Sequence, residues 1–185
     1  MFRPAYPITT ARLLLRPFRA GDLDALHAIQ SRPDVTRYLL WGTRTRDEVA
    51  EALRARLAMD ALEKQGDILV LAVTLRESGV LIGDVNLAWH SEEHRSGEFG
   101  FVFHPDHHGH GYAGEAAVEM LRLGFEGLGL HRIVGRADGR NVASARLMEK
   151  LGLRREAYFV QNEFLKGEWT DEVVYAMLAR EWADR

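Results

Sequence analysis

The sequence predicts an α/β domain with a mixed sheet and a central strand–helix–strand (βαβ) unit. Two observations support this class. Apolar segments of strand length alternate along the chain with segments whose apolar residues recur at helical spacing, and three consecutive strands lie in the middle of the order. No internal repeat and no linker rich in Pro, Gly or Ser divides the 185 residues, so a single domain over residues 1–185 is expected.

The first third of the chain reads as one strand and two helices. The segment RLLLRPF (12–18) has the length and apolar content of a strand, and GDLDALHAIQ (21–30) carries apolar residues at helical spacing. Thr45 and Glu48 form a T-x-x-E capping box, in which each side chain accepts the other residue's backbone N–H. We therefore predict a second helix that starts there and ends near Gly66.

Three strands follow in a run. The segments ILVLAVTL (68–75) and VLIGDVNLAW (80–89) are rich in β-branched and apolar residues, and a turn around Ser78 and Gly79 joins them. The third strand is EFGFVF (98–103), and the proline shortly after it ends the strand.

The last third continues the alternation of helices and strands. A helix is predicted through AAVEMLRLGFEGLG (116–129), and RIVGRA (132–137) is a short strand. A further helix begins at Asn141 and closes at Gly152, because glycine suits the left-handed conformation that follows a helix. A hairpin pattern ends the chain, with strands EAYFVQNEFL (156–165) and DEVVYAML (171–178) around the turn KGEW.

The composition excludes several classes of function. Hydrophobic residues make up 46% and charged residues 28%, which argues against disorder and against a fibrous protein. A net charge of −3 provides no basic field, so no nucleic-acid partner is expected. The absence of cysteine excludes disulfides, thiolate catalysis and Cys-ligated zinc. No apolar run reaches membrane-spanning length and the first residues lack the core of a signal peptide, so we expect a cytoplasmic protein without a membrane partner.

The stretch HPDHHGHGYAGEA (104–116) holds four histidines and three glycines between a strand and a helix. Imidazole is a common zinc ligand, which makes a metal site the first alternative. Structural zinc sites usually draw ligands from two separated segments, and catalytic ones often space two histidines as H-E-x-x-H on a helix. Neither pattern is present, so no metal site is expected.

A phosphate cradle is the second alternative for this stretch. Backbone N–H groups at the start of a helix attract anions, and glycine permits both a tight turn and the close approach of a ligand. Gly109, Gly111 and Gly114 meet this requirement. The P-loop form is excluded because no G-K-[ST] follows, and GHGYAG matches the dinucleotide string G-x-G-x-x-G without the doubly wound context. A third alternative, a loop whose glycines only make a turn, stays open on these observations.

A second motif decides between these alternatives. The segment NVASARLMEKLGL begins at Asn141, and it is similar to the N-x-x-S-x-x-x-x-E-K-x-G-F segment of the GNAT superfamily of acyl-CoA N-acyltransferases. The segment HHGHGYAGEA resembles that family's Q/R-x-x-G-x-G/A loop. The likeness covers nearly the whole chain and is closest to the RimJ/RimL type, through TARLLLRPFRAGDLDALHAI, RYLLWGTRT, LIGDVNLAW, GEFGFVFHPDHHGHGYAGEA and NEFLKGEWTDEVVYAML.

The resemblance implies a GNAT-like fold, a mixed and mostly antiparallel sheet flanked by helices, with the CoA loop in the central βαβ unit. It also implies that acetyl-CoA, or another acyl-CoA such as succinyl-CoA, binds with its pyrophosphate on the loop amides and its pantetheine arm along the strand before the loop. His108 stands where the family prefers Gln or Arg, and the loop has no Lys or Arg, so the backbone amides would bind the pyrophosphate. The residues implied for the cofactor are Phe101, Val102, Phe103, His108, Gly109, His110, Gly111, Tyr112, Ala113, Gly114, Asn141 and Ser144.

The same resemblance assigns the chemistry to a few groups. An unprotonated amine attacks the thioester directly, and the departing thiolate takes a proton from Ser144, directly or through a water. Glu98 is the candidate base, with a water chain as the alternative for an α-amine, whose reference pKa is near 8. The backbone N–H of Val102 is the candidate donor to the developing oxyanion. The plainer alternatives are a first-turn serine for Ser144, a helix N-cap for Asn141 and an exposed strand residue for Glu98.

Trp41, Trp169 and Tyr175 are the candidate residues of the acceptor site, with a place in the core as the alternative for each. The subgroup implies a protein N-terminus as the amine acceptor. Small-molecule amines or amino acids, and transfer of succinyl in place of acetyl, stay open as alternatives. A CoA-binding sensor without catalysis also stays open, and the protein is expected to be a monomer or homodimer.

Overall fold

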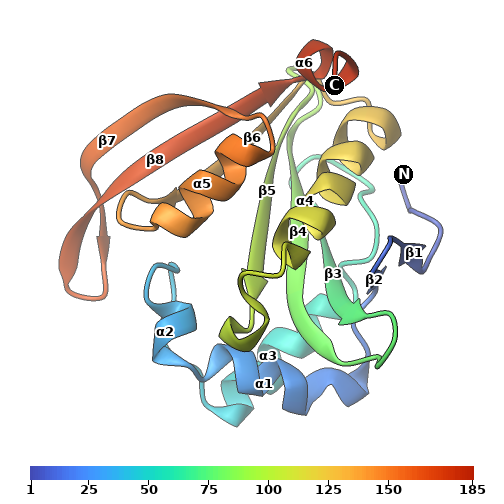
Figure 1. The fold of residues 1–185 in the computed structure, drawn as a ribbon, viewed down its shortest axis with the longest axis vertical. Coiled ribbons are helices and arrows are strands. Elements are labelled where there is room, and N and C mark those ends of the chain that lie inside the picture. The colour runs from blue at the N-terminus through green and yellow to red at the C-terminus, as the bar shows by residue number, and fades with distance from the viewer.

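The computed structural model describes residues 1–185 and is built on one eight-stranded sheet (Figure 1). Its strands are β1 (Ile8–Thr9), β2 (Leu13–Arg16), β3 (Ile68–Leu75), β4 (Leu81–Ser91), β5 (Ser96–Phe103), β6 (Arg132–Asp138), β7 (Arg154–Leu165) and β8 (Glu168–Leu178). They lie in the order β1-β2-β3-β4-β5-β6-β8-β7, and every neighbouring pair is antiparallel except β5 and β6. The predicted α/β class with a mixed, mostly antiparallel sheet is therefore confirmed.

Helices pack on both faces of this sheet. They are α1 (Leu23–Gln30), α2 (Pro33–Thr36), α3 (Arg46–Arg56), α4 (Tyr112–Arg122), α5 (Val142–Lys150) and α6 (Ala179–Ala183). On one face α4 and α5 supply Met120 and Met148 to the larger of two apolar cores, and on the other α1 and α3 supply Leu26 and Leu53 to the smaller one. No helix of the protein is both long enough and apolar enough to cross a membrane.

The helix predicted from the capping box begins where expected but is shorter. Thr45 Oγ1 accepts the N–H of Glu48 at 3.4 Å, and Glu48 Oε2 accepts the N–H of Thr45 at 2.7 Å, so α3 starts directly after the cap. The predicted end near Gly66 is wrong, since the helix stops well before it. The following segment instead makes two backbone hydrogen bonds between Leu62 and Phe2, and this tertiary pairing replaces further helical turns.

The other predicted elements are present with shifted ends. The strand β2 stops before Pro17, which has no N–H for a sheet hydrogen bond. The helix α4 starts earlier than predicted and passes into a π-helical turn over Leu123–Gly127. The helix α5 closes at Gly152, whose φ of +81° is the left-handed conformation predicted for it. The elements β1, α2 and α6 are not predicted, because they are too short to show a period.

The sheet opens between β5 and β6, which α4 joins into the predicted βαβ unit. The two strands pair only over Ser96–Glu98 and Arg132–Val134, and beyond these residues they diverge (Figure 1). The half of β5 from Phe99 to Phe103 therefore has β4 on one side and no strand on the other. A free strand edge of this kind offers backbone hydrogen bonds to a ligand that lies along it.

Candidate functional site

A cleft of about 480 Å³ occupies the opening between the diverging strands. Its walls come from the free half of β5, the loop before α4, the first turns of α4 and α5, and the segment from α2 to Leu39. Among the residues implied for the cofactor, His110 alone lies outside the lining. Those that line it are Phe101, Val102, Phe103, His108, Gly109, Gly111, Tyr112, Ala113, Gly114, Asn141 and Ser144.

The loop before α4 presents a row of free backbone N–H groups. None of the N–H groups of residues 109–114 donates to a carbonyl of the chain, and the first helical bond of α4 runs from Glu115 N–H to Gly111 O at 3.1 Å. Gly109 and Gly111 have φ values of +78° and +80°, the region that glycine adopts without the Cβ penalty of other residues. Successive free amides at a helix N-terminus form an anion site, which the helix dipole strengthens. This geometry fits the phosphate cradle; we call residues 109–114 the amide cradle.

The histidines of the loop hydrogen-bond to nearby backbone. His108 Nε2 lies 3.1 Å from the carbonyl of Phe103, and His110 Nδ1 lies 2.8 Å from the carbonyl of His108. His104 Nδ1 accepts the N–H of Asp106 at 3.2 Å. His108, at the position where the family prefers Gln or Arg, therefore connects the amide cradle to the end of β5.

Along β5 the backbone N–H groups of successive residues point alternately toward β4 and toward the cleft. The N–H of His104, directly after β5, donates to the carbonyl of Ile82 in β4 at 2.8 Å. The N–H of Val102, two residues before His104, therefore also points toward β4. The N–H groups of Phe101 and Phe103 point the other way, toward the cleft. The prediction that Val102 donates to an oxyanion is therefore wrong, because its N–H is directed toward β4.

The N-terminus of α5 forms the opposite wall of the cleft. Asn141 is its N-cap, and Asn141 Oδ1 accepts the N–H of Ser144 at 3.1 Å. Both residues also line the cleft. The cap therefore fixes the helical turn that carries the Ser144 hydroxyl, so the N-cap alternative for Asn141 and a place in the site hold together.

Glu98 lies on the opposite face of the sheet from α4, since its neighbour Phe99 points into the core on the α4 side. It does not line the cleft. Arg136 of β6 donates to Glu98 from Nε at 3.2 Å and to Glu172 of β8 from a terminal nitrogen at 3.1 Å. Burial raises the pKa of the Glu98 carboxyl, although the charges of Arg136 and His90 oppose the shift. A carboxylate with a raised pKa is better matched to accept a proton near neutral pH.

Arg136 and Glu172 are linked to the candidate base Glu98, and the sequence did not reveal this contact. Glu172 is 6% exposed, and its second oxygen accepts Asn162 Nδ2 at 2.9 Å. These residues come from three strands, β6, β8 and β7, which become neighbours only when the C-terminal hairpin folds back beside β6. No local pattern in the sequence reports such a pairing.

The three aromatic residues predicted for the acceptor site lie apart from one another, and none lines the cleft. Tyr175 is 3% exposed in the larger core and donates its hydroxyl to Glu149 at 2.7 Å, so its assignment to the acceptor site is wrong. Trp169 is exposed near the turn of the β7–β8 hairpin. Trp41 is half-buried under the guanidinium of Arg44, which lies 4.1 Å from the ring centroid.

Residues 34–39 supply a cleft wall for which no helix or strand is predicted from the sequence. Asp34, Val35, Tyr38 and Leu39 line the cleft. Lys166, at the tip of the β7–β8 hairpin, donates from Nζ to the carbonyls of Thr36 and Arg37 at 2.6 and 3.0 Å. These bonds fasten the end of α2 to the hairpin. The segment has no helical or strand period, and the resemblance carried by RYLLWGTRT, which begins at Arg37, does not by itself assign Tyr38 or Leu39 to the cleft.

The free edge of β5 and the amide cradle form the kind of site that suits a long phosphorylated donor lying along a strand, and Glu98 lies where β5 and β6 stop pairing. The family model for the acetyltransferase (GNAT) domain matches residues 12–154. The chain therefore belongs to the GNAT acetyltransferase family and is an acyl-CoA N-acyltransferase, which sets aside the alternative of a sensor without catalysis.

Several proteins similar to this chain are named as acetyltransferases. The chain is 38% identical over 175 residues to the uncharacterized N-acetyltransferase YnaD of Bacillus subtilis (strain 168), a match that covers 95% of this chain and 98% of that one. A GNAT-family acetyltransferase from Bacillus anthracis has a TM-score of 0.83 at 34% identity, covering 97% of this chain and 99% of that one. Spermidine N-acetyltransferase from Vibrio cholerae, solved with CoA and spermine, has a TM-score of 0.79 at 25% identity and covers 94% and 99%.

Proposed function

We propose that the protein transfers the acetyl group of acetyl-CoA to the N-terminal α-amine of a peptide or protein. The observation that carries the donor half is the row of free amides at 109–114 beside the unpaired edge of β5. Such amides fit a pyrophosphate. The cleft-facing peptide groups of Phe101 and Phe103 fit the pantetheine arm, whose own amides pair like an added strand, although the Phe103 carbonyl also accepts from His108.

The charges beside the diverging strands support an acceptor with one amine. Glu98 and Glu172 share Arg136, and Asp138 is paired with Arg140 at 2.7 Å. A polyamine carries several positive charges and needs unpaired carboxylates along its length. An α-amine needs one proton acceptor, and with a reference pKa near 8 it loses its proton more readily than a lysine amine.

In this proposal three groups of the chain act on the transfer. Glu98 takes a proton from the attacking amine, directly or through a water, and Arg136 holds its carboxylate in place. A cleft-facing amide of β5, from Phe101 or Phe103, donates to the oxygen of the developing tetrahedral centre. The Ser144 hydroxyl gives a proton to the sulfur, directly or through a water, as the carbon–sulfur bond breaks, and solvent returns a proton to the serine. Acetyl-CoA supplies the activated thioester.

A second candidate acceptor is a polyamine, because the similar Vibrio cholerae enzyme is named for spermidine and its structure holds spermine. A panel assay of CoA release separates the two, using peptides with free N-termini, the same peptides N-acetylated, spermidine and spermine. We expect kcat/KM for the best free peptide to exceed that for spermidine by at least about tenfold, with no release from the blocked peptides. Faster acetylation of spermidine would replace the peptide acceptor by a polyamine. The same peptides with succinyl-CoA test the choice of donor.

Glu98→Gln is expected to lower kcat by on the order of tenfold to a hundredfold, at the low end for a general base because water can replace it. The base acts only when ionised, and its pKa is raised, so wild-type activity should fall as the pH drops through that raised pKa. We expect this acid limb to be absent in the variant when rates are expressed per unprotonated amine. Glu92→Gln, in the exposed turn between β4 and β5, is the matched control. Identical pH profiles for wild type and Glu98→Gln would remove Glu98 from the mechanism.

A further inference from the structure

Arg12, directly before β2, is bound to the first turns of α4. Glu115 Oε2 accepts Arg12 Nε at 2.7 Å, while Glu115 Oε1 accepts the N–H of Arg12 at 2.8 Å and the hydroxyl of Thr10 at 2.6 Å. Burial acts to raise the pKa of Glu115, but the hydrogen bonds from Thr10 and Arg12 outweigh it, and the pKa lies below its ordinary value. The Glu115 side chain is 16% exposed, so this is an oriented, partly buried ion pair.

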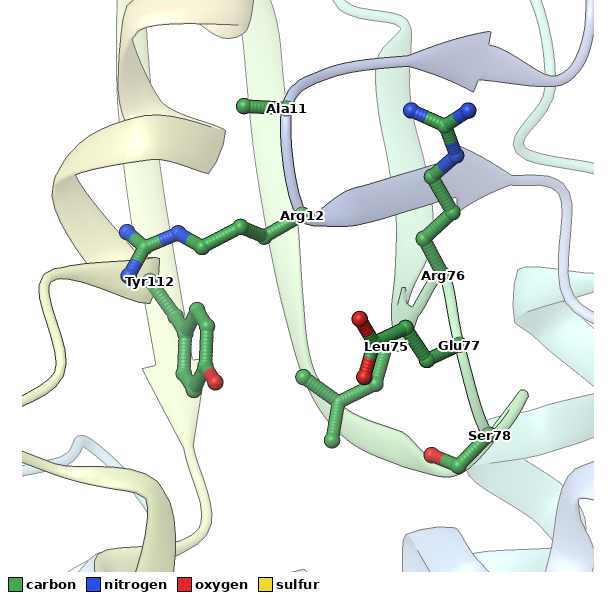
Figure 2. A pocket seen from close by; sticks show the side chains of 7 residues that line it. All are labelled: Ala11, Arg12, Leu75, Arg76, Glu77, Ser78 and Tyr112. Atoms are coloured by element: carbon green, nitrogen blue, oxygen red, sulfur yellow. The ribbon is translucent and has the colours of Figure 1, made fainter.

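The same guanidinium holds one peptide group of the amide cradle. A terminal nitrogen of Arg12 donates to the carbonyl of His110 at 2.8 Å, and its guanidinium carbon lies 4.7 Å from the ring centroid of Tyr112. Figure 2 shows the Arg12 side chain extending toward Tyr112. In a trans peptide the carbonyl oxygen and the next N–H point in opposite directions. Because the His110 carbonyl is held toward Arg12, the N–H of Gly111 points away from Arg12.

The charge of Arg12 matters as well as its geometry. Glu115 lies in the first turns of α4, where its carboxylate is near the helix end that attracts anions. Without a partner, this carboxylate would repel a pyrophosphate bound to the amide cradle. The guanidinium of Arg12 neutralises it at hydrogen-bond distance.

We propose that Arg12 is a positioning residue for the pyrophosphate of acetyl-CoA. It acts by fixing the peptide group between His110 and Gly111 and by neutralising Glu115, without touching the reacting atoms. The inference rests on the proposed binding of acetyl-CoA at the amide cradle and does not depend on the acceptor. It predicts that loss of Arg12 raises Kd and KM for acetyl-CoA and leaves kcat nearly unchanged.

The test compares two donors in Arg12→Met and in a control, Arg76→Met. S-acetyl-pantetheine carries the thioester but lacks the pyrophosphate, so it does not use the amide cradle. Arg76 lines the same pocket of about 610 Å³ as Arg12, but its side chain extends away from Tyr112 (Figure 2). For Arg12→Met we expect Kd and KM for acetyl-CoA to rise about ten- to a hundredfold, by calorimetry and kinetics. With S-acetyl-pantetheine, kcat/KM should change by less than about threefold, and Arg76→Met should match wild type with both donors.

Several outcomes overturn the proposal. An equal loss with both donors means general damage to the fold, and an unchanged Kd for acetyl-CoA means that the cradle forms without Arg12. Either result leaves the acetyltransferase function standing, whereas a wild type that does not bind acetyl-CoA overturns the donor site itself. If Arg12→Met does not fold, Arg12→Lys replaces it, because lysine keeps the charge near Glu115 without reaching the His110 carbonyl as well. A lysine variant with wild-type affinity for acetyl-CoA would also overturn the proposal.

Discussion

Gly111→Val is expected to raise the Kd of acetyl-CoA by at least about a hundredfold. Gly111 has a φ of +80°, which a β-branched residue adopts only under strain. An added Cβ would meet only a guanidinium nitrogen of Arg12 at 3.5 Å, so no backbone atom obstructs the Cβ itself. The strain is instead relieved by rotation of the loop, which turns the free N–H groups out of the amide cradle. Each charged hydrogen bond lost weakens binding by roughly tenfold or more, and several are lost together.

Gly129→Val is the matched control for this substitution. Gly129 has a φ of +71° with open space around its Cα, and it lies in the loop before β6, outside the cleft. Both variants should lose a similar amount of thermal stability, because both place valine in the left-handed region. Calorimetric titration should show near wild-type affinity for acetyl-CoA in Gly129→Val only. If Gly111→Val bound acetyl-CoA within about threefold of wild type, the backbone of this loop would not be the pyrophosphate site.

Local signals in the sequence predicted the parts of this site that lie within one segment. The glycines at 109, 111 and 114 predict a tight backbone turn before a helix. Gly109 and Gly111 have the positive φ of such a turn. Asn141 and Ser144 stand three apart at another helix start, which brings them to one wall of the cleft. The capping box predicted the first residue of α3 for the same reason, since both partners lie within one turn.

Contacts between distant segments could not be predicted in this way. Lys166 reaches the carbonyls at the end of α2, and Glu115 reaches Arg12 across more than half of the chain. Each pair depends on the order of strands in the sheet, which no single segment encodes. The prediction that Tyr175 belongs to the acceptor site is wrong for a related reason. Its alternation along β8 is visible in the sequence, but which face of that strand meets α5 is decided by the packing of the whole sheet.

Ser144→Ala is expected to lower kcat by at least about a hundredfold while changing the Kd of acetyl-CoA by less than about tenfold. A proton donor to the departing thiolate has its value only in the transition state, so its loss reduces turnover and not ground-state binding. The substitution leaves the cap intact, because Asn141 accepts the backbone N–H of residue 144 and not its hydroxyl. Alanine is also favourable in a helix, so α5 should keep its stability.

Ser144→Thr separates the hydroxyl from the shape of the residue, since it keeps the proton donor and adds one methyl group. We expect it to retain most of the turnover that Ser144→Ala loses, in single-turnover assays with acetyl-CoA saturating. A fall of only a few-fold in Ser144→Ala would mean that the thiolate takes its proton elsewhere. Tyr175 could not be that source, because it is buried and its hydroxyl is bound to Glu149. The remaining hydroxyl groups that line the cleft belong to Tyr38 and Tyr112, so the same assay on their phenylalanine variants would then identify the donor or leave solvent water as the source.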